Sequence, residues 1–262
     1  VDLYSEKMMY KTAGYDRPLF SCRIELDDSN SQDTKGNGNG IPEVGETVAL
    51  SFTLTNVGEG SAVHPYIRLK NRSRREIDLV KGTLELGTSL RDGEPCVKDS
   101  ERCYRYLDSG ESETDRLILE LRDSPDESWS LEVLMGSNLS YDYNTTVLGG
   151  FSDYFQLKYN LSLTPKNTFS SIDLAQPKIL IERTDKNSDL VEITGYVEDA
   201  SGIKDILIFQ GEDKVYYRGE AGQPGKLPFA IEQRLLEGSN PFYILAKDSE
   251  GLTTSQYINI WK

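Results

Sequence analysis

The chain has 262 residues, of which 37% are hydrophobic and 27% are charged, and it carries a net charge of −14 at pH 7. That length suffices to bury one large core or two ordinary ones. The negative charge argues against a nucleic-acid partner, whose phosphates require a basic face, and against docking on anionic lipid. It fits a protein outside the cytoplasm that meets cations or basic partners.

The start of the chain has no clear structural pattern. Because it begins at Val1, without a methionine or a signal peptide, we interpret the sequence as a mature or excised fragment of a longer protein. Residues 1–19 lack a clean periodicity and are predicted to form an extended leader from a preceding region. No apolar run approaches the roughly 18 residues that a membrane helix needs, so we expect no membrane insertion.

A loop rich in glycine, asparagine and acidic residues lies between two predicted strands, residues 20–26 and residues 47–56. Calcium needs six to eight oxygen ligands around one point, and glycine lets a backbone turn sharply enough to gather them. Counted from Lys35, the spacing of the loop matches a calcium-binding loop at positions 3, 5, 6 and 12, which are Asn37, Asn39, Gly40 and Glu46.

The loop has two interpretations, because position 1 holds Lys35 where a calcium loop has an aspartate. The first is a calcium site in which Asp28 or Asp33 supplies the missing ligand. Calcium is the only cofactor that the sequence indicates, and the candidate ligands are Asp28, Asp33, Asn37, Asn39, Glu43 and Glu46. The second is a solvated turn whose Asn-Gly steps supply residues with positive φ.

The rest of the first unit also predicts strands, at residues 62–70, 76–80, 82–86, 115–122, 128–135 and 151–163. Residues 87–105 are predicted to form a long surface loop. In that loop Cys96 and Cys103 flank a six-residue, mostly polar segment, close enough for a hairpin disulfide in an oxidising compartment. Cys22 is then expected to be a buried thiol. We assign residues 20–165 to a first β-sandwich domain and residues 166–176 to a linker.

The second unit, residues 177–262, is the more regular of the two. Its sequence predicts seven short strands, at residues 178–182, 190–198, 204–209, 214–218, 227–235, 241–247 and 253–261. Seven short strands with frequent turns are typical of an immunoglobulin-like sandwich. The predicted fold class is therefore all-β, with two tandem immunoglobulin-like β-sandwich domains.

Six stretches carry a family resemblance. They are GNGNGIPEVGE (36–46), FTLTNVG (52–58) and LDSGES (107–112) in the first unit, and DASGIKDILIF (199–209), DKVYY (213–217) and LEGSNPFYILAKDSEGL (236–252) in the second. The first three resemble bacterial cell-adhesion-related β-sandwich domains, and the last three resemble bacterial Ig-like modules. In this order the pair is similar to the C-terminal accessory region of exported carboxyl-terminal processing serine peptidases. The resemblance implies a peptidase domain upstream, with serine and lysine as its catalytic residues.

Nothing in the sequence has the pattern of a catalytic site. It contains no nucleophile elbow, phosphate-binding loop or zinc-protease helix, and its single histidine, His64, has no recognisable nucleophile as a partner. We therefore expect that this chain is not itself an enzyme. The tyrosines that can form a sugar or peptide platform, with packing as the alternative, are Tyr141, Tyr143, Tyr216 and Tyr217.

These patterns lead to two functional hypotheses. The first is a non-catalytic accessory region of a larger exported bacterial protein, located in the periplasm, at the cell surface or in the medium. It would position or recruit substrate for a peptidase, with a protein or the peptidase domain of the same parent chain as its partner. The alternative is a free-standing module for surface adhesion or glycan binding.

Overall fold

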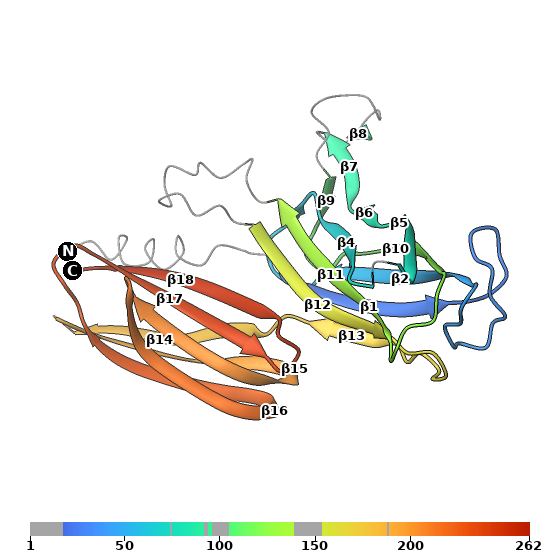
Figure 1. Cartoon of the computed structure of the whole chain (residues 1–262). Helices are drawn as coiled ribbons and strands as arrows, with labels where there is room; N and C mark the ends of the chain where they lie inside the picture. Colours follow the sequence, from blue (N-terminus) through green and yellow to red (C-terminus); the bar gives the residue numbers. More distant parts are fainter. Residues whose placement is uncertain (1–17, 74, 92–93, 96–104, 139–153, 188) are drawn as a thin grey trace. The chain divides into compact units, whose positions relative to one another are not determined.

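The computed structural model describes residues 18–262 apart from residues 74, 92–93, 96–104, 139–153 and 188. Over this range the chain is all-β, with several antiparallel sheets and no helix (Figure 1). No helix that is long and apolar enough to cross a membrane occurs in this described part of the chain. The strands divide into two compact units, residues 20–174 and residues 175–262.

Unit 20–174 contains two larger sheets and one small sheet. The first has the order β13-β1-β2-β10-β5, formed by β13 (Ile172–Ala175), β1 (Phe20–Asp27), β2 (Thr47–Asn56), β10 (Ser112–Leu121) and β5 (Ile77–Lys81). The second has the order β12-β11-β4-β6, formed by β12 (Tyr154–Leu163), β11 (Trp129–Asn138), β4 (Tyr66–Asn71) and β6 (Thr83–Glu85). The small sheet contains β3 (Ala62–Val63), β9 (Arg105–Leu107), β7 (Thr88–Arg91) and β8 (Glu94–Pro95).

The core of unit 20–174 lies on the faces that strand alternation predicts. Successive side chains of a strand point to opposite faces, so apolar residues two apart share one face. Such sets are buried on β2, β10 and β11, and they are Val48, Leu50, Phe52 and Leu54, then Leu117, Leu119 and Leu121, then Trp129, Leu131, Val133 and Met135. The apolar alternation of these three predicted strands therefore marks the faces that form the core.

The strand predicted at residues 62–70 is divided at His64 and Pro65 into β3 and β4, which belong to different sheets. Two other segments of unit 20–174 also differ from the sequence prediction. Residues 87–105 are not a loop throughout, because β7, β8 and the first residue of β9 lie within them. The end of the predicted linker, Ile172–Ala175, forms β13 and joins the sheet beside β1. Both segments have few strand formers, so their strands depend on pairing with distant neighbours.

The cysteines fall into two groups. Cys96 and Cys103, the predicted disulfide pair, lie outside the described residues. Cys22 on β1 is a buried free thiol, as predicted, and burial raises the pKa of this thiol to about 12. A thiol that stays protonated in an apolar core behaves as a small hydrophobic side chain.

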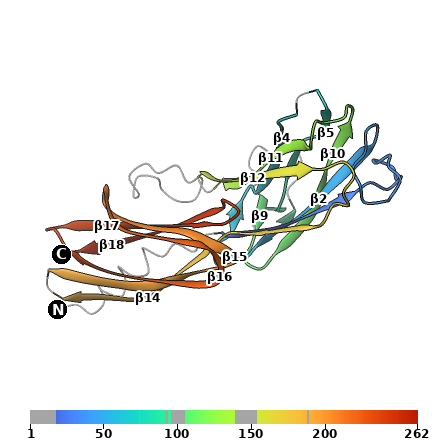
Figure 2. The same ribbon diagram turned by 60° about the horizontal axis from the view of Figure 1, so that its bottom comes forward.

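Unit 175–262 has five strands, of which two are unusually long (Figure 2). They are β14 (Lys178–Asn187), β15 (Leu190–Gln210), β16 (Asp213–Arg234), β17 (Ser239–Asp248) and β18 (Thr253–Trp261). The first half of β15 pairs with β14 and with the second half of β16. Its second half pairs with β17 and with the first half of β16. The register shifts between Asp199 and Ile203, where the two halves meet.

The seven predicted strands of this unit fall on these five strands, with only Leu235 lying beyond the end of β16, because β15 and β16 each contain two of them. The gap between the predicted strands 190–198 and 204–209 holds the register shift inside β15 and is not a chain reversal. Both halves of the long strands contribute to one core. Its members include Val191, Ile193 and Val197 from the first half of β15, Ile206 and Ile208 from the second half, and Phe242, Ile244 and Ile258 from β17 and β18.

Candidate functional sites

The acidic loop between β1 and β2 folds back against the sheet from which it emerges. Lys35 and Thr47 exchange both backbone hydrogen bonds, with N···O distances of 2.8 and 3.1 Å. At the end of β10, the amide of Leu121 donates to the carbonyl of Glu46, and the amide of Gly45 donates to the carbonyl of Leu121. Lys35, which occupies the first position of the predicted calcium loop, is therefore a backbone anchor of the loop.

Glu46 closes the loop through both of its carboxylate oxygens. Oε1 accepts the amide of Asn37 at 3.1 Å, and Oε2 accepts the amide of Glu43 at 3.0 Å. The side chain is buried, and its burial raises its pKa, with the nearby charges of Asp28 and Glu43 acting in the same direction. A buried carboxylate that accepts two amides fixes the backbone on both sides of it.

Asp28 holds the opposite side of the same loop. Its Oδ2 accepts the amide of Gly40 at 2.8 Å, and its backbone carbonyl accepts the amide of Gly38 at 3.0 Å. Gly38 and Gly40 both have φ of 75°, a conformation that glycine adopts without steric cost. The Asn-Gly steps therefore supply positive φ, as the turn interpretation predicts.

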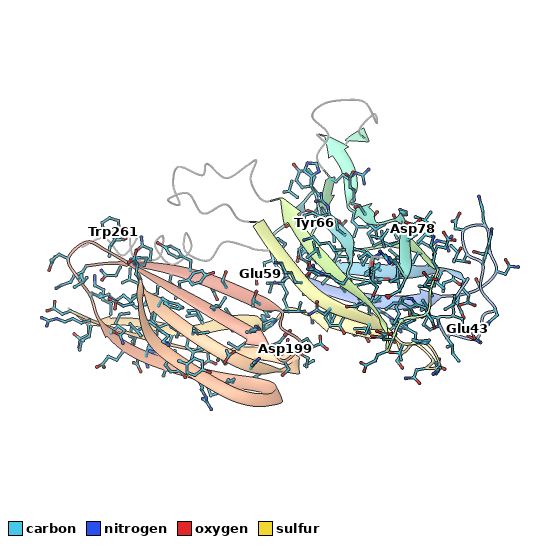
Figure 3. The ribbon with its side chains drawn as sticks, viewed as in Figure 1. Glu43, Glu59, Tyr66, Asp78, Asp199 and Trp261 are labelled. Carbon is cyan, nitrogen blue, oxygen red and sulfur yellow. The ribbon has the colours of Figure 1, made fainter. Side chains whose placement is uncertain are left out.

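Asn37, Asn39 and Glu43 lie in the exposed part of the loop, and Figure 3 labels Glu43. The side-chain oxygen of Asn37 accepts the amide of Asn39 at 3.0 Å, and that of Asn39 accepts the amide of Ile41 at 2.7 Å. The side-chain amide of Asn37 donates to Glu43. The oxygens at positions 3 and 5 of the predicted calcium loop thus already bind the loop's own amides.

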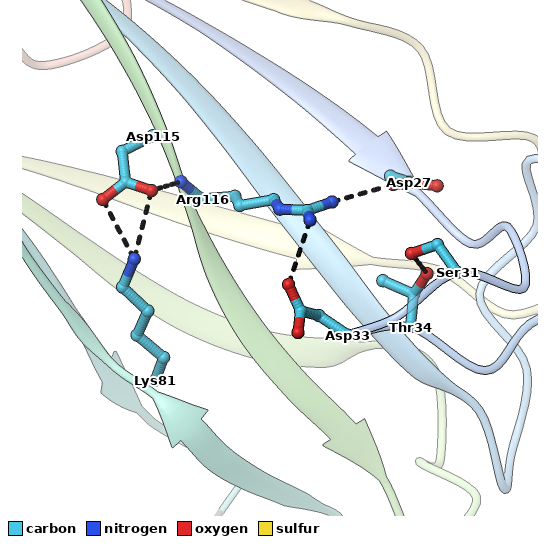
Figure 4. A network of polar contacts seen from close by, with 7 residues as sticks. All are labelled: Asp27, Ser31, Asp33, Thr34, Lys81, Asp115 and Arg116. Carbon is cyan, nitrogen blue, oxygen red and sulfur yellow. Dashed lines mark hydrogen bonds and ion pairs between the residues drawn. The ribbon is translucent and has the colours of Figure 1, made fainter.

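Asp33 is directed elsewhere, toward β10 (Figure 4). Its Oδ2 lies 3.0 Å from Nη2 of Arg116, whose Nη1 lies 3.4 Å from Oδ2 of Asp27. The neighbouring Asp115 forms an ion pair with Lys81 at 2.9 Å. The structure therefore joins five of the six candidate ligands in one hydrogen-bonded loop and pairs Asp33 with Arg116.

This arrangement lets the loop act as a rigid, acidic connection between two strands. In the described part of the chain, no group of three or more His, Cys, Asp and Glu side chains is arranged to hold a metal ion. Calcium binding by the loop stays a prediction, and the hydrogen bonds show how the loop keeps its shape through its own groups.

Replacing Glu46 with glutamine is expected to destabilise unit 20–174 by about 1–3 kcal/mol. A glutamine side chain has one acceptor oxygen, so one of the two amides that Glu46 binds is left facing an NH₂ group. Urea unfolding followed by circular dichroism measures the difference. The matched control is Glu43→Gln, at an exposed residue. A loss as large as that of Glu46→Gln would show that the two amides bound by Glu46 do not account for its effect.

A second candidate surface is the outer face of the sheet formed by β16, β15, β17 and β18. One cross-strand row runs from Lys214 through Phe209 and Tyr243 to Tyr257. The next row contains Tyr217, Leu207 and Leu245. We call these seven residues the aromatic face. Neighbouring strands lie about 4.8 Å apart, so a row across four strands is about 14 Å long.

The aromatic face remains accessible within its unit. Tyr217 and Tyr243 are 59% and 36% exposed, and the other aromatic members are partly buried. The hydroxyl of Tyr217 donates to Asp205 at 2.9 Å, and Nζ of Lys214 lies 5.6 Å from the centre of the Tyr217 ring. These contacts hold the ring of Tyr217 at the surface.

The tyrosines singled out from the sequence have different positions. Tyr217 belongs to the aromatic face, Tyr216 packs against the core, and Tyr141 and Tyr143 lie outside the described residues. Sequence reasoning missed Phe209, Tyr243 and Tyr257. The signal was present, because apolar residues occupy both alternating faces of the predicted strands 204–209 and 241–247.

Comparisons with known proteins give little information about this chain. No family model matches it, and no curated protein matches it. Among solved structures it is similar to the secreted serine protease VesC from Vibrio cholerae, with a TM-score of 0.26 and 9% sequence identity. The similarity covers 84% of this chain and 47% of that chain, so this chain spans about half the length of VesC. A likeness with so low a TM-score supports no conclusion about fold or function.

Proposed function

We propose that this chain is a non-catalytic, polypeptide-binding region of a larger exported bacterial protein. In this proposal its two units are immunoglobulin-like β-sandwiches that lie outside the cytoplasm. They recruit or position an extended polypeptide substrate for a peptidase domain of the same parent chain. The observation that carries the proposal is the aromatic face.

The composition of the aromatic face favours a protein partner. Tyrosine and phenylalanine are enriched in protein interfaces, because they bury much apolar area at a low cost in side-chain entropy. The face combines three tyrosines, one phenylalanine and two leucines on adjacent strands of one sheet. Contiguous apolar surface of this kind marks interaction sites on soluble proteins.

The edge of the sheet favours an extended segment as the bound form. β16 pairs with β15 along its length and, among the described strands, with no other. Lys214 and Tyr217 of the aromatic face lie on this edge strand. An extended polypeptide can add to such an edge through its backbone and place alternate side chains on the adjoining face.

Binding of an unfolded polypeptide tests the proposal. The probe is fluorescein-labelled α-lactalbumin, reduced and carboxymethylated so that it stays unfolded, and its binding is followed by fluorescence anisotropy. We expect Tyr243→Ser to weaken binding about tenfold, because an interface tyrosine commonly contributes 1–2 kcal/mol. The matched control is Tyr66→Ser on β4 of the other unit, and the thermal midpoints of both variants establish that they fold. Absent binding, or equal binding by both variants, contradicts the proposal.

Glycan binding is the second candidate function, and the exposed rings of Tyr217 and Tyr243 favour it. Flat aromatic rings can stack on the apolar face of a sugar as well as on side chains. A glycan array screened with the wild-type chain and Tyr243→Ser distinguishes the two functions. Glycan signals that the variant loses, without binding of the polypeptide probe, would favour the adhesion module.

A further inference from the structure

Three polar residues with buried side chains lie on the inner faces of unit 175–262 where the halves of β15 meet. They are Asp199 on β15, Asp248 on β17 and Thr254 on β18, and their exposed fractions are 8%, 0% and 6%. Asp248 follows Ala246 by two residues, so it points to the same inner face, and Ala246 pairs with Thr254 on the neighbouring strand. Inner faces normally hold apolar side chains, so this polar cluster requires an explanation.

Two oxygens of this cluster are buried without a hydrogen-bond partner. Oδ1 of Asp248 accepts the amide of Leu252 at 2.7 Å, whereas its Oδ2 has no partner. Oγ1 of Thr254 has none either. Only three side-chain atoms in the described part of the chain are in this condition, and two of them belong to this cluster. A buried carboxylate oxygen without a partner is costly, so it indicates that a positively polarised group belongs beside it.

Asp199 adds a second carboxylate from another strand. Its Oδ1 accepts the amides of Ser201 and Gly202 at 2.8 and 3.0 Å, which shapes the register shift in β15. The carbonyl of Gly202 in turn accepts the amide of Ser249 at 2.8 Å. This chain of hydrogen bonds joins the segment of Asp199 to the residue that follows Asp248, so the two carboxylates face the same end of the unit.

Burial and neighbouring carboxylates both act on the acidic side chains at this end. Burial raises the pKa of Asp248 to about 6, and the charges of Asp199 and Glu250 act in the same direction. Burial and Asp199 also raise the pKa of Glu250, which lies in the turn between β17 and β18. The charge of Asp199 makes Asp248 and Glu250 harder to ionise, and a bound cation relieves that repulsion.

We propose that Asp248, Asp199 and Thr254 form a binding site for a calcium ion at this end of unit 175–262. The ligands are carboxylate and hydroxyl oxygens, which suit a hard cation rather than zinc or copper. No group of three or more His, Cys, Asp and Glu side chains in the described residues surrounds one metal position. The site therefore has two carboxylates and one hydroxyl, and water or backbone oxygens complete the shell. It is separate from the acidic loop at residues 27–46.

Calcium titration of the whole chain tests the proposal. The protein is stripped with chelator, and calcium binding at pH 8 is measured by calorimetry and by the thermal midpoint. Because a ligand that binds only the native state stabilises it, we expect calcium to raise the midpoint of unit 175–262 by several degrees. Asp248→Asn keeps the size of the side chain and removes its charge, so calcium affinity falls at least tenfold. Glu46→Gln, in the acidic loop, leaves this calcium effect unchanged.

A second variant covers the case in which Asp248→Asn fails to fold. Thr254→Val removes the unpartnered hydroxyl at nearly constant volume, so it is expected to weaken calcium binding and to raise the midpoint of the calcium-free protein. The proposal is wrong if calcium leaves the midpoint of wild-type protein unchanged. It is also wrong if Asp248→Asn and Thr254→Val bind calcium as the wild type does, or if only Glu46→Gln abolishes binding.

Discussion

Replacing Trp129 with alanine is expected to destabilise unit 20–174 by about 3–5 kcal/mol, which is a large part of the stability of an ordinary domain. Trp129 begins β11 and is fully buried, and it is the largest of the fully buried side chains in the described residues. Its indole Nε1 donates to the carbonyl of Asp123 at 3.0 Å. Alanine therefore leaves a cavity and also removes the donor for that carbonyl.

The chain supplies its own control, because it contains only one other tryptophan. Trp261, at the end of β18, is 51% exposed, and Trp261→Ala is expected to cost less than about 1 kcal/mol. Urea unfolding followed by far-ultraviolet circular dichroism gives both free energies. In the intact protein, the fluorescence of Trp129 and Trp261 reports on the two units separately. Equal losses in the two variants would mean that Trp129 does not anchor the core.

Replacing Gly36 with alanine is expected to disrupt the acidic loop and to cost about 2–4 kcal/mol. A Cβ at this position would lie 1.9 Å from the backbone carbonyl oxygen of Asp28. Neither atom belongs to a flexible side chain, so the backbone itself must move. That carbonyl accepts the amide of Gly38, and the carboxylate of Asp28 accepts the amide of Gly40. Hydrogen exchange of these two amides should therefore accelerate strongly.

Gly38→Ala is the matched control in the same loop. A Cβ at Gly38 meets no atom within 4 Å, so its cost comes only from the positive φ of 75°. That cost is about 1 kcal/mol. If the two variants unfold at the same urea concentration, then the close approach of Gly36 to Asp28 is not what holds the loop together.

The sequence predicted the strands of unit 20–174 best where one face is apolar. Val48, Leu50, Phe52 and Leu54 alternate strictly, and local alternation is enough to assign a half-buried strand. The short strands β7 and β8 have no such pattern. Their backbones are held by pairing with each other and with β9, which no local window of sequence can reveal.

The sequence predicted the members of the candidate sites only where they are close together in the chain. Asp33 was assigned to the loop because it is close in sequence, but its partner Arg116 lies 83 residues away on β10. Residues 190–198 and 204–209 were predicted as separate strands, and long-range pairing keeps them within one strand. Asp248 follows Phe242, Ile244 and Ala246 at intervals of two, so its inward direction was visible in the sequence. The absence of a hydrogen-bond partner for its Oδ2 was not visible there, because it depends on the neighbouring strands.

The long strands of unit 175–262 also make this unit indivisible. β15 and β16 each contribute one half to each group of paired strands, and their side chains meet in one core. One group consists of β14, the first half of β15 and the second half of β16, and the other contains the remaining halves together with β17. Because β15 and β16 run through both groups, separating the groups would expose the apolar side chains of the shared core. We therefore expect unit 175–262 to unfold as a whole rather than one half at a time, so that partly opened states, which proteases cleave, are rarely populated.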